Sequence, residues 1–200
     1  MKTILVLDVG GVLATNLTPQ LWQNLATLAN TSVATLYASY KKEISKKLWI
    51  GECTEGQFWQ WLEQYSIQLT IERQRELITQ ALQPLPALQY LQQWSQLAEI
   101  HIMSNHLSDW LQPLLAPYET YIERIHVSDQ VRLSKPNPQW FTLLHEQFND
   151  AALIWFVDDS DHNVAAAELI GWNTLLADQA HNWIATLSER LQLASNSLPQ

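Results

Sequence analysis

The chain has 200 residues, 47% of them hydrophobic, which suits one sizeable core or a core with a smaller insertion. Its net charge of -9, with only 11 lysines and arginines, argues against a nucleic-acid partner, because phosphate backbones are held by clustered cations. The single cysteine, Cys53, excludes an intrachain disulfide, and no segment approaches the roughly 20 apolar residues of a membrane span. We therefore expect a soluble, cytoplasmic protein with no membrane partner.

The first strand is expected at residues 4–7, an apolar run that ends at Asp8. Such a run, without polar alternation, is typical of a strand covered on both faces in a parallel sheet. Gly10 and Gly11 follow, and glycines let a backbone turn tightly and approach a ligand. Because ligands bind at the carboxyl ends of parallel strands, Asp8 is a candidate functional residue.

Residues 15–85 are expected to form an all-helical insertion. The capping box of Thr54 and Gln57 predicts one helix start, and Gly51 predicts the end of the preceding helix. Lys41 to Lys47 holds four lysines, which we interpret as a solvated helix face; the alternative is that they draw in an anionic substrate. The helices are expected at about residues 18–30, 33–48, 54–62 and 71–82.

From residue 86 onward, helices and strands alternate. This alternation predicts an α/β fold, a Rossmann-like parallel sheet with helices on both faces. Further strands are expected at 99–103, 125–127, 152–157 and 174–176, and helices at about 88–94, 108–115, 136–147, 161–170 and 180–193.

Polar groups suited to phosphoryl transfer stand at separate strand or loop ends that should share one sheet edge. Asp8 offers a nucleophile or metal ligand, and Ser104 a hydroxyl. Lys135 offers a cation, and Asp158 and Asp159 offer oxygen ligands. Carboxylates at two strand ends suit Mg²⁺, and a phosphate needs cationic and hydroxyl donors on its other oxygens.

The order and spacing of these groups resemble the four motifs of the haloacid-dehalogenase-like (HAD) hydrolases. The motif residues are Asp8 to Val12, Ser104-Asn105, Lys135-Pro136, and Asp158-Asp159 followed by Asn163, Ala166-Ala167 and Gly171. The resemblance implies a core of residues 1–14 and 86–200 and a helical cap of residues 15–85. A cap after the first motif is similar to that of glucose-1-phosphatase-like members and the phosphatase domain of soluble epoxide hydrolases.

The resemblance also implies a Mg²⁺ site. Asp8 would attack phosphorus through one oxygen, forming an aspartyl-phosphate, and bind the metal through the other. The backbone carbonyl of Gly10 would be a second ligand and Asp159 a third, while Asp158 would orient metal-bound water.

Phosphate binding is implied for three residues. Ser104 and the backbone amide of Asn105 would hold the phosphate, and Lys135 would neutralise the charges of phosphate and Asp8. A carboxylate is a weak nucleophile toward a dianion, so a metal and a lysine must lower the repulsion. The expected function is Mg²⁺-dependent hydrolysis of a small phosphorylated metabolite.

The chain departs from the family pattern at Gly10, where phosphatases of this family carry an Asp that protonates the leaving group. A positioned general acid typically contributes about 10² to 10⁴ in rate, so metal, lysine and nucleophile could still form a working catalyst. His106 is a possible substitute, but we interpret it as a helix cap or an exposed loop residue.

Two alternatives remain open at this point. One is a non-catalytic or weakly active HAD-fold protein that binds a phosphate or metabolite. The other is a dehalogenase, whose chemistry would use Asp8 without a metal. Paired Asp158 and Asp159 argue against the dehalogenase, since they would repel one another and any carboxylate substrate.

Overall fold

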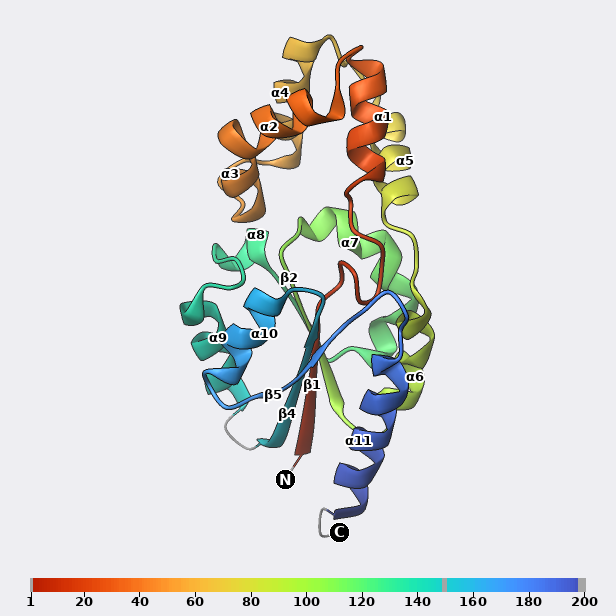
Figure 1. Cartoon of the computed structure of the whole chain (residues 1–200), viewed down its shortest axis with the longest axis vertical. Coiled ribbons are helices and arrows are strands. Elements are labelled where there is room, and N and C mark those ends of the chain that lie inside the picture. Colours follow the sequence, from red (N-terminus) through yellow and green to blue (C-terminus); the bar gives the residue numbers. More distant parts are fainter. Residues whose placement is uncertain (1, 149–150, 198–200) are drawn as a thin grey trace.

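A computed structural model describes residues 2–148 and 151–197; residues 1, 149–150 and 198–200 of the expected core lie outside this description (Figure 1). Its sheet has five strands in the order β3-β2-β1-β4-β5, and every pair is parallel. The predicted α/β fold with a parallel sheet is therefore confirmed. The strands are β1 (Lys2–Leu7), β2 (Glu99–Ser104), β3 (Arg124–Val127), β4 (Ala151–Asp158) and β5 (Asn173–Leu176).

Helices bury both faces of the sheet. Successive side chains of a strand point to opposite sides, so each strand contributes residues to both faces. Leu5 and Leu7 of β1 pack with one set of helices, and Ile4 and Val6 pack with the other. Figure 1 shows the two helical layers on either side of the strands. The first layer contains α6 (Leu91–Trp94), α7 (Ser108–Leu115) and α11 (Trp183–Ser197); the second contains α9 (Pro138–His145) and α10 (Asp161–Glu168), and α8 (Ser128–Val131) follows β3.

The segment of residues 15–85 lies beyond the carboxyl ends of the strands (Figure 1). The chain enters and leaves it side by side: the Thr15 amide donates to the Gln83 carbonyl, and the Leu85 amide donates to the Leu13 carbonyl. Its helices are α1 (Gln20–Leu28), α2 (Val33–Glu43), α3 (Ser45–Trp49), α4 (Glu55–Leu62) and α5 (Ile71–Ala81). Short 3₁₀ helices cover Glu63–Tyr65, Pro86–Tyr90, Ala116–Tyr121 and Glu146–Phe148.

The single helix expected over residues 33–48 is wrong, because the helix breaks at Ile44, where φ is -120°. Leu36 and Tyr40 form the buried stripe of α2, and an unbroken helix would bring Lys47 onto that stripe. After the break, Ser45 and Leu48 are buried instead and Lys47 is exposed. The break therefore keeps a charged side chain out of the core.

Two contacts hold residues 49–55 against the core. The Glu55 carboxylate accepts hydrogen bonds from the indole nitrogens of Trp59 at 3.0 Å and of Trp110, in α7, at 2.7 Å. Arg132, just after α8, donates to the carbonyl of Gly51. The predicted capping box of Thr54 and Gln57 is present and begins α4 at this contact. Within the described residues, no helix is long and apolar enough to cross a membrane.

Candidate active site

A cleft of about 900 Å³, its open mouth included, lies between the carboxyl edge of the sheet and the segment of residues 15–85. Side chains far apart in the sequence meet there because they follow neighbouring parallel strands. Among the residues that line it are six of the predicted site residues: Asp8, Gly10, Ser104, Asn105, Lys135 and Asp159.

Lys135 lies between two carboxylates at the base of this cleft. Its Nζ is 2.9 Å from Oδ1 of Asp8 and 2.6 Å from Oδ2 of Asp158, and its side chain is 1% exposed. Burial raises the pKa of Asp8 to about 7, while Lys135 opposes the rise. Although burial lowers the pKa of Lys135, the charges of Asp8 and Asp158 raise it above its usual value. The lysine therefore stays charged and stabilises both buried carboxylates.

The backbone fixes the Asp8 carboxylate in direction. The Asp8 amide donates to the carbonyl of Val157 at 2.9 Å, which extends the pairing of β1 with β4 by one residue. The amide of Val9 donates to Oδ1 of Asp8 at 2.7 Å, the same oxygen that Lys135 contacts. The Val9 amide and the Lys135 ammonium group therefore both contact Oδ1, and among the described residues neither contacts Oδ2, which is left for a ligand.

Three carboxylates form a cluster that could hold a cation. Asp8, Asp158 and Asp159 each offer an oxygen, and these oxygens lie within 4.8 Å of one another. Burial raises the pKa of Asp159, and the charge of Asp158 adds to the rise. When all three are ionised, Lys135 balances only one of the three negative charges. This donor set, of oxygens with an excess of negative charge, fits a hard divalent ion.

Asp158 is the least accessible member of the cluster, with 0% of its surface exposed. Besides Lys135, it accepts hydrogen bonds from the Ser160 amide and from the side-chain amide of Asn163, both at 2.9 Å. These bonds fix the carboxylate that positions the ammonium group of Lys135.

Asn105 anchors the loop that carries Lys135. Its side chain donates to the Lys135 carbonyl at 2.9 Å and accepts from the Lys135 amide at 2.7 Å. The sequence pointed only to the backbone amide of Asn105, because side-chain pairing across 30 residues leaves no local pattern. Ser104, the last residue of β2, is buried at the cleft beside it.

Asn16 was not predicted as a site residue, although it lines the cleft. Its side-chain amide donates to Oδ2 of Asp159 at 2.9 Å. A single asparagine in the link to a helical segment carries no periodicity or motif that could reveal this contact. The pairing becomes visible only when the ends of β1 and β4 are brought together.

The interpretation of His106 as a cap or an exposed loop residue is wrong. His106 is buried at the cleft, with its ring 5.4 Å from that of Trp49 and 5.7 Å from that of Trp110. Burial lowers the pKa of His106 to about 4, so the ring is neutral at pH 7 and holds no proton to donate as a cation. Trp49, in turn, is only half-buried and lines the cleft.

Neither a comparison with protein-family models nor one with curated proteins finds a match. Solved structures do resemble the chain. A HAD-like family hydrolase from Porphyromonas gingivalis is 20% identical over 96% of this chain and 98% of its own, with a TM-score of 0.74. A HAD family enzyme from Bacteroides thetaiotaomicron is 18% identical over 93% and 98%, with a TM-score of 0.79. That enzyme has also been crystallised with magnesium and inorganic phosphate.

Dehalogenases resemble the chain less closely. The L-2-haloacid dehalogenase from Xanthobacter autotrophicus, with chloropropionic acid covalently bound, is 17% identical over 100% of this chain and 85% of its own. Its TM-score is 0.60. These likenesses show that the chain has the HAD-like fold, as the four motifs predicted.

Proposed function

Starting from a HAD-like fold, we propose that this protein is a Mg²⁺-dependent phosphomonoesterase for a small phosphorylated metabolite, with residues 15–85 as its cap. The observation that carries the proposal is the convergence of Asp8, Lys135 and Asp159 on one cleft, with Lys135 bonded to Asp8 and Asp158. The cap would cover the cleft, select the substrate and exclude water while it is closed.

Asp8 is the proposed nucleophile. One carboxylate oxygen of Asp8 forms a bond to phosphorus while the ester P–O bond breaks, and the alcohol leaves with a proton taken from water. Water then hydrolyses the aspartyl-phosphate, releases inorganic phosphate and restores the carboxylate. Lys135 and the Val9 amide hold Oδ1 and so fix the orientation of the carboxylate.

The phosphate oxygens are proposed to bind Ser104, the amide of Asn105 and Lys135, all of which line the cleft. The ammonium group of Lys135 reduces the repulsion between the carboxylate of Asp8 and the incoming dianion. The two bonds between the Asn105 side chain and the Lys135 backbone support this role, because they hold the lysine in place before substrate arrives.

The proposed metal ligands are Asp8, the backbone carbonyl of Gly10 and Asp159, with Asp158 completing the acidic cluster. When bound, Mg²⁺ would supply positive charge to the phosphate oxygens and to the carboxylate cluster. The excess of negative charge in the cluster supports this assignment, and so does the magnesium and phosphate complex of the Bacteroides enzyme.

The acidic cluster favours this proposal over the dehalogenase. Without a cation, Asp158 and Asp159 would oppose the approach of a carboxylate substrate to Asp8. The remaining alternative, a phosphate-binding protein without activity, differs from the proposal in turnover and not in ligand.

The test is release of phosphate from phenyl phosphate, with Mg²⁺ and with EDTA, by the native chain and by Asp8→Asn. We expect turnover only with Mg²⁺ and its loss in the variant, on the order of 10⁶ for removal of a nucleophile. A native chain that binds phosphate but never releases it from an ester would be a binding protein. Unchanged activity of Asp8→Asn would remove Asp8 as the nucleophile. A panel of phosphorylated metabolites would then identify the substrate.

A further inference from the structure

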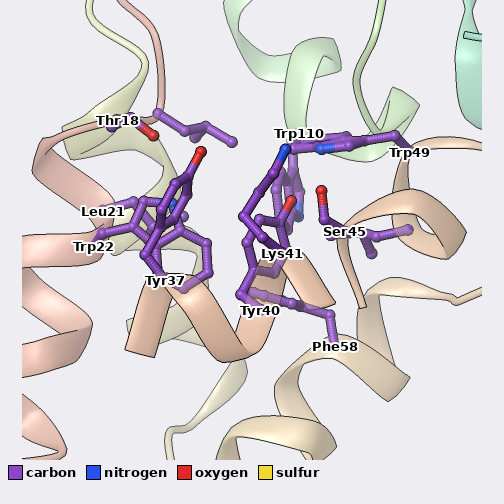
Figure 2. A pocket seen from close by; sticks show the side chains of 12 residues that line it. Thr18, Leu21, Trp22, Tyr37, Tyr40, Lys41, Ser45, Trp49, Phe58 and Trp110 are labelled. Carbon is purple, nitrogen blue, oxygen red and sulfur yellow. The ribbon is translucent and has the colours of Figure 1, made fainter. Parts of the chain in front are cut away.

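A second pocket lies between the helices of residues 15–85 and Trp110 of α7, and it adjoins the cleft (Figure 2). It holds about 360 Å³, its open mouth included, and shares Leu17, Thr18 and Trp49 with the cleft. A group attached to a phosphate in the cleft would therefore reach this pocket past Thr18 and Trp49.

Half of the residues that line this pocket are aromatic. Trp22 packs against Tyr40 with ring centroids 4.4 Å apart and against Tyr37 at 5.2 Å. Phe58 meets Trp110 edge to face at 5.7 Å, and both rings also line the pocket. Rings held by such contacts form rigid apolar surfaces, which bind a flat apolar group well because little side-chain freedom is lost.

Polar groups gather at one end of the pocket. Figure 2 shows the Tyr37 hydroxyl and the Lys41 amine at the end occupied by Thr18 and Trp49, while Phe58 lies at the opposite end. Lys41 supplies the positive charge among the lining residues. Its neighbours Lys42, Lys46 and Lys47 are exposed, as predicted, and do not line the pocket. The arrangement, apolar surfaces with a few directed polar groups, is typical of a site for a small organic ligand.

We propose that this pocket binds the organic part of the substrate, an aromatic group that carries an acidic substituent paired with Lys41. The proposal rests on the proposed function, because the shared residues join the pocket to the cleft where the phosphate would lie. The substrate class is then a phosphomonoester of a small aromatic alcohol. An aliphatic group would fill the same space without the edge and face contacts that a ring makes with Tyr37 and Trp110.

The test measures binding rather than turnover. Ethylphosphonate, benzylphosphonate and 4-carboxybenzylphosphonate are titrated calorimetrically into the native chain with Mg²⁺. We expect benzylphosphonate to bind at least about tenfold more tightly than ethylphosphonate, equivalent to 1.4 kcal/mol. The carboxylate should add about threefold more, as expected for one partly exposed ion pair. Equal affinity for the ethyl and benzyl compounds would overturn the proposal.

Lys41→Ala is compared with Lys42→Ala, a neighbouring lysine outside the pocket. Only Lys41→Ala should remove the advantage of the carboxylated ligand over benzylphosphonate; equal losses in both variants would reject the role of Lys41. Tyr37→Ala should lower the ratio of benzyl to ethyl affinity. If that variant fails to fold, the ligand series on the native chain still decides.

The two proposals can fail separately. A preference for the benzyl compound without hydrolysis of phenyl phosphate would support the pocket and reject the phosphatase. Hydrolysis of phenyl phosphate with no preference among the phosphonates would support the phosphatase and reject the aromatic pocket.

Discussion

The side-chain oxygen of Asn16 occupies the space in which a Cβ atom on residue 10 would stand. The same amide donates to Asp159 through its nitrogen. Any side chain on residue 10 would force the Asn16 amide to move, and we expect this to disturb its bond to Asp159. Gly10 is thus coupled to the positioning of Asp159, a proposed metal ligand.

This coupling predicts that Gly10→Ala and Asn16→Ala have the same effect and are not additive. Each change removes the hydrogen bond that orients Asp159, so we expect Mg²⁺ affinity to fall by about tenfold in each, as for partners of metal ligands elsewhere. Calorimetric titration of Mg²⁺ into both variants and the double variant completes a double-mutant cycle. Losses that add in the double variant would show that the two residues act independently.

The sequence predicts well those parts of the site that follow from local patterns. Asp8 and the Asp158-Asp159 pair end apolar strands, and parallel strands end at a common edge, so their convergence could be expected. Contacts between loops could not be expected, because the bond from Asn16 to Asp159 joins residues 143 apart. The break at Ile44 could not be expected for a related reason. Helical periodicity shows that a segment is helical, but it does not show where the helix must change direction to pack against its neighbours.

Replacement of Lys135 by Met is expected to destabilise the protein by about 3 to 5 kcal/mol at pH 7, because it leaves the buried carboxylates of Asp8 and Asp158 without their cation. Urea unfolding of the variant measures the effect. Lys47→Met, a change at an exposed lysine, is the matched control and should stay within about 0.5 kcal/mol of the native chain. Equal stability of both variants would mean that Lys135 contributes nothing to the buried charge balance.

Without a positioned acid at residue 10, hydrolysis should depend steeply on the leaving group. A series of substituted phenyl phosphates tests this, since every member keeps the ring and only the acidity of the phenol varies. We expect kcat/KM to rise as the phenol becomes more acidic, because the phenoxide leaves without a proton from the protein.

The comparison for this series is Gly10→Asp combined with Asn16→Ala, which places a carboxyl group at residue 10 and removes the amide that blocks it. A working acid there should flatten the dependence and raise the rate for the poorest leaving groups by up to about 10². A native chain whose rates are the same across the series would show that some other group already donates the proton.

His101 and His126 form a buried pair on neighbouring strands, away from the cleft. Nδ1 of His101 lies 3.2 Å from Nε2 of His126, and Nε2 of His101 lies 3.0 Å from a carboxylate oxygen of Glu99. Although burial raises the pKa of Glu99, hydrogen bonds from Lys2 and His101 hold it below its usual value. The ionised Glu99 only accepts, so His101 carries its proton on Nε2, and its bare Nδ1 accepts from His126. Both rings are neutral in this arrangement.

This pair should make the protein less stable in mild acid. Burial lowers the pKa of His126 to about 4 and that of His101 below its usual value. Between about pH 6.5 and pH 4 the unfolded chain therefore binds more protons at these residues than the folded one, and their contribution to stability falls as the pH falls. Asp8, with its raised pKa, acts in the opposite direction throughout this range, so the pair is best isolated by substitution.

His126→Gln keeps a side-chain N–H that can reach His101 but takes up no proton. We expect the loss of unfolding free energy between pH 7 and pH 5 to shrink in this variant by on the order of 1 kcal/mol, since one lowered pKa no longer contributes. Urea unfolding at both pH values measures the difference. His162→Gln, at an exposed histidine, is the control and should keep the native pH dependence. If His126→Gln and His162→Gln lose the same unfolding free energy between pH 7 and pH 5, burial does not lower the pKa of His126 and the prediction is wrong.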